Sequence, residues 1–66
     1  MKKRMLKALK ANALSNIEKH KVNIEIYMHN AVGIGEHSDI MSAIESEIDK
    51  ISHFHDQLEV IERYLE

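Results

Sequence analysis

Both glycines of this chain lie in the stretch His29-Asn30-Ala31-Val32-Gly33-Ile34-Gly35-Glu36-His37-Ser38-Asp39, and the sequence contains no proline. Gly33 suits the left-handed residue that commonly ends a helix. Gly35 permits a second change of direction, because glycine tolerates positive φ. Long segments with helical periodicity lie on either side. The stretch therefore predicts the turn of an α-helical hairpin, over about residues 33–38.

The segment before the turn predicts a helix over about residues 3–32. Its apolar residues are spaced three, four and four apart, an eleven-residue helical period. This first stripe consists of Leu6, Leu9, Ala13, Ile17, His20, Ile24, Met28 and Ala31. A strand is the alternative over residues 22–26, where apolar and polar residues alternate. The helical pattern continues on both sides of that segment, so we favour the helix.

The segment after the turn predicts a second helix over about residues 39–65. Its apolar residues follow a heptad pattern, which is typical of helices that pack along a narrow seam. This second stripe consists of Ile40, Ile44, Glu47, Ile51, Phe54, Leu58, Ile61 and Leu65. The two stripes have different periods, so we expect weak supercoiling rather than a regular coiled coil.

The predicted fold is all-α, a single antiparallel helical hairpin over residues 1–66. A chain of 66 residues buries little surface by itself. Two helices also cannot cover both apolar stripes. We therefore expect the hairpin to dimerise into a four-helix bundle, with the stripe residues forming its core and its oligomer interface.

One polar residue interrupts each stripe, His20 in the first and Glu47 in the second. With a turn near residues 33 and 34, antiparallel partners have residue numbers that sum to about 67 or 68. His20 and Glu47 satisfy this sum. A buried imidazole or carboxylate is costly unless it is hydrogen-bonded. We predict that the two side chains meet near mid-helix, where they hydrogen-bond each other or a symmetry mate and fix the helix register. A bound metal, or side chains that bend out to water, are the alternatives.

The charges are unevenly distributed along the chain. Residues 1–21 carry seven Lys and Arg against a single acid, Glu18. We expect the C-terminal acids Glu59, Glu62 and Glu66 to neutralise this basic start, because an antiparallel hairpin brings the two ends together. The alternatives are that the basic start contacts nucleic-acid phosphates or lies on an anionic membrane surface. The candidate phosphate contacts are Lys2, Lys3, Arg4, Lys7 and Lys10.

Motifs for catalysis, cofactors and membrane insertion are missing from the sequence. The chain has no cysteine, and its five histidines show neither the Glu-x-x-His nor the His-Glu-x-x-His pattern of helical metal sites. A small metal-binding bundle is therefore a minor alternative, and we expect no metal, no cofactor and no enzymatic activity. No apolar run reaches the ~18 residues of a membrane span. We expect a soluble, cytoplasmic protein.

The run Asn30-Ala31-Val32-Gly33-Ile34-Gly35-Glu36-His37-Ser38-Asp39-Ile40, followed by Ala43-Ile44-Glu45 and His55-Asp56-Gln57-Leu58-Glu59, resembles small uncharacterised proteins of marine cyanobacterial phages of the contractile-tail type. The resemblance covers roughly residues 13–65 and carries over no catalytic or binding residue. It implies a phage origin and a location in the infected host cell. We expect a structural or protein-interaction module that acts through self-association and a protein partner. A nucleic-acid-binding protein is the alternative.

Overall fold

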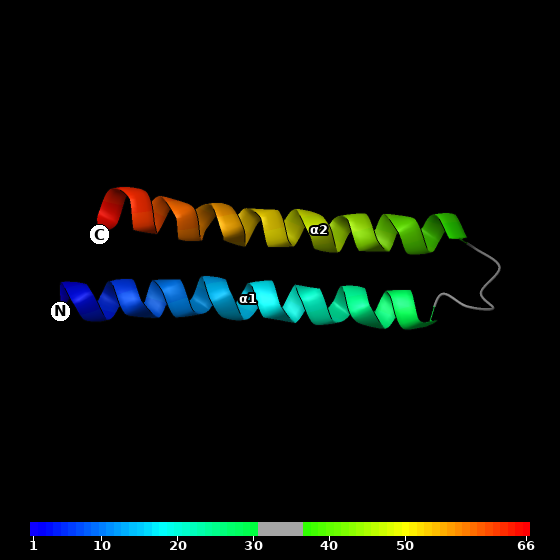
Figure 1. Ribbon diagram of the computed structural model, residues 1–66, viewed down its shortest axis with the longest axis horizontal. Helices are drawn as coiled ribbons and strands as arrows, with labels where there is room; N and C mark the ends of the chain where they lie inside the picture. Colours follow the sequence, from blue (N-terminus) through cyan, green and yellow to red (C-terminus); the bar gives the residue numbers. More distant parts are fainter. Residues whose placement is uncertain (31–36) are drawn as a thin grey trace.

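The computed structural model describes residues 1–30 and 37–66, and its architecture is an antiparallel pair of helices (Figure 1). Helix α1 spans Lys2–Asn30 and helix α2 spans His37–Val60. A π-helical turn, η1, continues α2 over Ile61–Leu65. The two chain ends lie together at one end of the molecule. The all-α hairpin is confirmed, and Gly33 and Gly35 lie outside the described residues.

The helix boundaries differ slightly from those expected. Helix α2 begins at His37, two residues before the predicted start at Asp39, so Asp39 lies within its first turn. A negative charge there is favourable, because the N-terminal end of a helix carries partial positive charge. Helix α1 runs without a break through residues 22–26, so the alternative strand is wrong. Packing of the apolar stripe against α2 has outweighed the strand preference suggested by the alternation of apolar and polar residues.

The molecule is long and thin, with extents of 51 × 15 × 10 Å. Its accessible surface is 5314 Å², against about 4,300 Å² for a compact monomer of this mass. Among residues 1–30 and 39–66, the buried apolar side chains are Ala13 and Ile61, and the buried polar ones are His20 and Glu47. The hairpin by itself therefore has a thin core with a polar centre.

Most of the stripe residues lie between the two helices. Ile61 is buried, and eight others are half-buried: Leu6, Ile17, Ile24, Ile40, Ile44, Ile51, Phe54 and Leu58. Leu9, Met28 and Leu65 are exposed, so within one hairpin they are not core residues. A single partner helix covers only a narrow strip of α1, and Leu9 and Met28 lie at its edges. Leu65 lies in η1, whose wider turn moves it off the heptad line.

Candidate functional site

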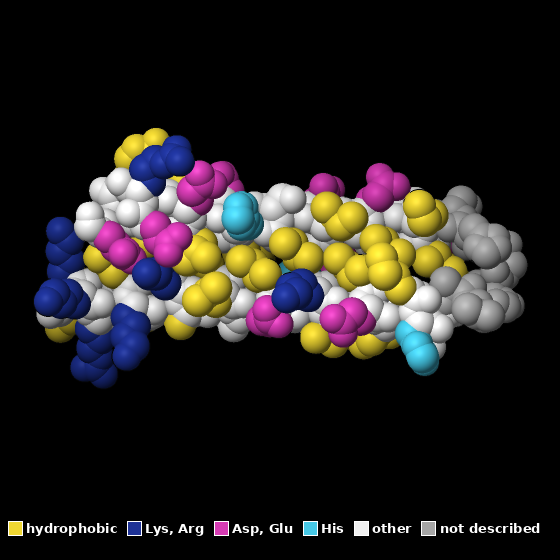
Figure 2. Space-filling view, in the orientation of Figure 1, with side chains coloured by type: hydrophobic (Ala, Val, Ile, Leu, Met, Phe, Trp, Pro, Cys, Tyr) yellow, Lys and Arg dark blue, Asp and Glu magenta, His cyan; other side chains and the backbone are white. Residues whose placement is uncertain are grey.

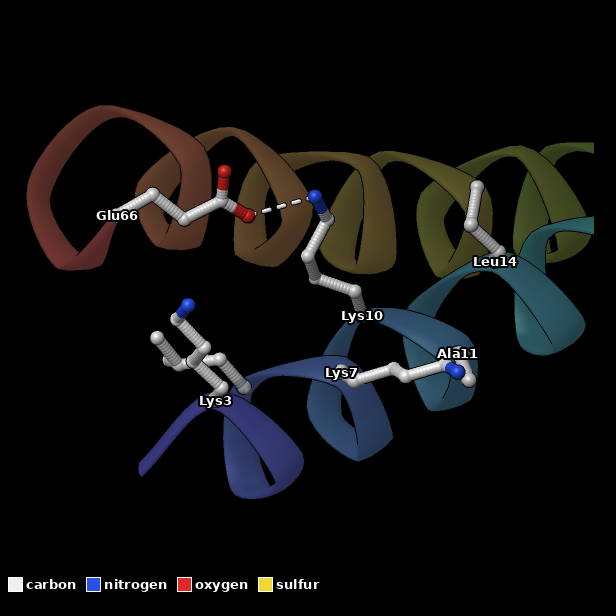
Figure 3. A pocket seen from close by; sticks show the side chains of 7 residues that line it. Lys3, Lys7, Lys10, Ala11, Leu14 and Glu66 are labelled. Carbon is white, nitrogen blue, oxygen red and sulfur yellow. Dashed lines mark ion pairs between the residues drawn. The ribbon is translucent and has the colours of Figure 1, made fainter. Parts of the chain in front are cut away.

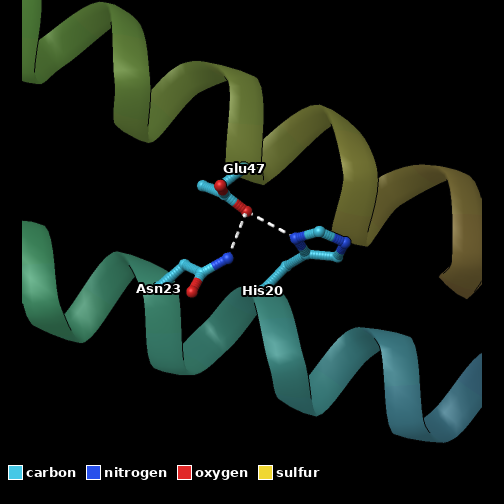
Figure 4. Close-up of polar contacts among 3 residues, drawn as sticks. All are labelled: His20, Asn23 and Glu47. Carbon is cyan, nitrogen blue, oxygen red and sulfur yellow. Dashed lines mark hydrogen bonds and ion pairs between the residues drawn. The ribbon is translucent and has the colours of Figure 1, made fainter.

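A buried polar contact joins α1 and α2 near the middle of the hairpin (Figure 4). The Nδ1 atom of His20 lies 2.5 Å from the Oε2 atom of Glu47. Both residues are only 7% exposed. A carboxylate can only accept a hydrogen bond, so the imidazole Nδ1 donates. The two polar residues that interrupt the apolar stripes therefore meet across the helix interface. Each provides a hydrogen-bond partner for the buried side chain of the other.

Two further residues complete this site: the sequence reasoning missed Asn23, and it placed Phe54 in the second stripe without a contact to His20. The side-chain amide of Asn23 donates to the same Glu47 Oε2 atom at 3.3 Å. The ring of Phe54 stacks on His20, with a centroid distance of 6.2 Å and an interplanar angle of 12°. Asn23 lies three residues after His20, which is the spacing that places two side chains on one side of a helix. That spacing was the available signal.

The surroundings of Glu47 favour its ionised form. Burial by itself raises the pKa of this carboxyl group, because it removes water from the charge. The hydrogen bonds from His20 and Asn23, together with the nearby Lys50 charge, outweigh burial and hold the pKa of Glu47 below its ordinary value. The site thus stabilises a carboxylate inside a helix interface that is otherwise apolar.

The predicted neutralisation of the basic start is found at one residue. The Lys10 Nζ atom lies 2.6 Å from Glu66 Oε1 and 3.8 Å from Glu62 Oε2. The hydrogen bond to Glu66 raises the pKa of Lys10, although partial burial opposes it. Glu59, near the end of α2, pairs with Arg63 in η1 at 3.1 Å. Among the described residues, ion pairs are absent from four of the candidate phosphate contacts: Lys2, Lys3, Arg4 and Lys7.

A groove of about 490 Å³ lies beside these lysines at the chain-end side of α1 (Figure 3). We call it the basic groove. Leu6, Ala11 and Leu14 supply its apolar surface, and lysines form its rim. It is lined by Lys3, Leu6, Lys7, Lys10, Ala11, Leu14 and Glu66. An apolar floor with a cationic rim suits an amphipathic partner that places carboxylates beside apolar side chains.

Apolar side chains also cover much of the outer surface. Figure 2 shows a band of them between the two helices, with Lys and Arg gathered at the end that holds the termini. Within residues 1–30 and 39–66, thirteen large hydrophobic residues are exposed: Met1, Met5, Leu9, Leu14, Val22, Ile26, Tyr27, Met28, Met41, Ile48, Val60, Tyr64 and Leu65. Where apolar side chains adjoin one another, as in the band of Figure 2, they offer an apolar surface to a partner.

Metal-binding clusters and membrane-spanning helices are absent from the described part of the chain. No group of three or more His, Cys, Asp or Glu side chains there is placed to hold a metal ion. None of the described helices combines the length and apolar character needed to cross a membrane. Comparisons with protein-family models, curated proteins and solved structures found no match to this chain.

Proposed function

We propose that this chain is a structural or protein-interaction module that acts by self-association, with two hairpins forming a four-helix bundle. The observation that carries the proposal is the contrast between core and surface. Within the described residues two apolar side chains are buried, while thirteen large ones are exposed. A second hairpin would cover many of these, and burial of apolar surface is the main force that stabilises small folds.

The concentration dependence of thermal unfolding tests this proposal. A folded dimer that unfolds to two free chains becomes more stable as protein concentration rises. We expect a higher Tm, followed by circular dichroism at 222 nm, at about 200 µM than at about 2 µM. The same Tm at both concentrations, with a sharp unfolding transition, would mean that the hairpin folds alone.

Nucleic-acid binding is the second candidate function, and one observation favours it. Lys2, Lys3, Arg4 and Lys7 form no ion pair among the described residues, so their charges are available to phosphates. Phosphate contacts would make the affinity for a labelled duplex fall steeply as salt rises. Anisotropy titrations at low and physiological salt measure that slope. No aromatic residue lies within the basic residues 2–10, so side chains on which nucleic-acid bases could stack are missing there.

The biological setting is a further part of the proposal. The resemblance around residues 30–40 supports a phage accessory protein that works in the cytoplasm of an infected cell and binds a host or virion protein. A pull-down from infected lysate, compared with a variant unable to self-associate, would test whether such a partner recognises the assembled form. A partner captured equally by both forms would mean that self-association is not required.

A further inference from the structure

The hairpin is electrically polarised along its length. Its terminal half, residues 1–15 and 52–66, carries six Lys and Arg against four Asp and Glu. The described residues of the other half, 16–30 and 37–51, carry three Lys and Arg against six Asp and Glu. Two copies that lie side by side therefore attract each other most strongly when their long axes point in opposite directions.

We infer that the basic groove is the docking site for α1 of a second copy, which packs antiparallel about a twofold axis near Leu14. This inference rests on the proposed self-association and names the surface that mediates it. Leu14 is 50% exposed and lies at the inner end of the groove (Figure 3). It is also close to the middle of α1, which spans Lys2–Asn30. Two α1 helices would therefore overlap over most of their length.

The twofold axis fixes which residues face each other. Around an axis at Leu14, facing residues have numbers that sum to about 28 or 29. Residues 14–25 of the second copy then lie over residues 3–14, the segment that contributes every α1 residue of the groove. Leu14 meets its own symmetry mate, and Ile17 of the second copy lies over the apolar floor. An apolar surface thus meets an apolar surface.

The charges at the rim agree with this arrangement. Glu25 of the second copy comes opposite Lys3 and Arg4, one turn from Lys7. Arg4 and Glu25 are exposed, and the helical rotation over the 21 positions between them leaves the two side chains about 60° apart around α1. Lys21 of the second copy comes opposite Lys7, but Glu18 of its own helix already compensates Lys21 at 3.1 Å. Because the contact is symmetric, each attraction occurs twice.

Cysteine cross-linking tests the position of the axis. The chain contains no cysteine, so Leu14→Cys introduces one thiol per copy. A disulfide requires Cα atoms within about 7 Å, which a twofold axis at this residue provides. We expect Leu14→Cys to form a disulfide-linked dimer under mild oxidation. Val22→Cys is the matched control, because Val22 is 49% exposed but would lie more than about 20 Å from its symmetry mate.

Charge reversal tests the rim contacts. Arg4 and Glu25 form no ion pair within the described part of the hairpin, so substitutions there leave each copy intact. We expect Arg4→Glu or Glu25→Arg alone to raise the dimer Kd roughly tenfold, because each replaces two attractions with repulsions. The double variant Arg4→Glu/Glu25→Arg restores the contacts and should return Kd close to the wild-type value.

The outcomes separate this inference from the proposed function. Cross-linking at position 14 with charge-reversal rescue supports both. If dimers form in solution but Leu14→Cys forms no disulfide, or if Val22→Cys forms one instead, the docking geometry is wrong. Self-association itself would still be supported. A wild-type chain that remains monomeric at all concentrations overturns both.

Discussion

The imidazole Nδ1 of His20 and the carboxylate Oε2 of Glu47 are 2.5 Å apart, although the two residues are 27 positions apart in the sequence. Each is the single polar residue in its apolar stripe. Removing two polar groups from water has a cost that hydrogen bonding only partly offsets. We therefore interpret the pair as the contact that selects the register of α1 against α2. In any other register both groups would be buried without a hydrogen-bond partner.

A double-mutant cycle measures this coupling. His20→Leu or Glu47→Leu alone should lower the Tm, because each leaves one polar group without its partner. The double variant should lose less than the sum of the two, since apolar replacements of a buried pair are often neutral or stabilising. Strictly additive changes in the free energy of unfolding would show that the two side chains act independently.

The pair also predicts a dependence of stability on pH. The folded-state pKa of Glu47 is depressed, so the folded chain prefers the carboxylate. Its stabilising contribution is complete above the unfolded-state pKa and is lost as pH falls through the folded-state pKa. At a fixed protein concentration, the Tm difference between wild type and Glu47→Gln should therefore shrink on acidification below about pH 4.3.

The control for this experiment is Glu45→Gln, which removes one exposed carboxylate from the same helix. The Tm of Glu45→Gln, plotted against pH, should run parallel to that of the wild type. If the Glu47→Gln difference stays constant down to pH 2, the carboxylate of Glu47 does not contribute in the way described.

The contact at Ala13 should not tolerate a larger side chain. Ala13 has no exposed surface, so α2 approaches α1 as closely as a methyl group allows. Ala13→Leu should destabilise the chain by about 1–3 kcal/mol, because the extra atoms force the helices apart. The exposed Ala8→Leu variant, in the same helix, should change the free energy of unfolding by less than about 0.5 kcal/mol. Equal effects in chemical denaturation would contradict this packing.

The π-helical turn should depend on Ile61. This side chain is 7% exposed at the start of η1, where it anchors the C-terminal end on α1. Ile61→Ala should cost about 2–5 kcal/mol, from lost burial and from the cavity left behind. Val60→Ala is the matched control, because Val60 is exposed, and it should cost clearly less. A smaller loss for Ile61→Ala than for Val60→Ala would show that η1 is not packed as described.

The sequence predicted the hairpin and the meeting of His20 with Glu47, because both follow from helical periodicity and antiparallel numbering. It could not predict η1, since an apolar heptad pattern is the same whether the final turn closes as an α- or a π-helix. The exposure of Leu9 and Met28 was missed for another reason. The period of apolar residues in a sequence shows which residues lie on the same side of a helix. It does not show how much of that side a single packed helix covers.

The basic start shows a similar limit. Charge complementarity predicted neutralisation along the whole segment. Within the described residues, however, Lys10 is the one cation of residues 2–10 that forms ion pairs with the C-terminal acids. The direction of each side chain decides which lysine reaches an acid, and composition does not contain that direction. Among the cations left without such partners, Lys3 and Arg4 are the two that the antiparallel contact between two α1 helices would place opposite Glu25.

Sedimentation equilibrium at micromolar concentration tests self-association most directly. The wild-type chain should sediment as a species of twice the 7.7 kDa monomer mass. Dilution should shift the equilibrium toward the monomer, and the shift should begin at higher concentration for Arg4→Glu. A single 7.7 kDa species across the whole concentration range, with helical content unchanged, would contradict the account.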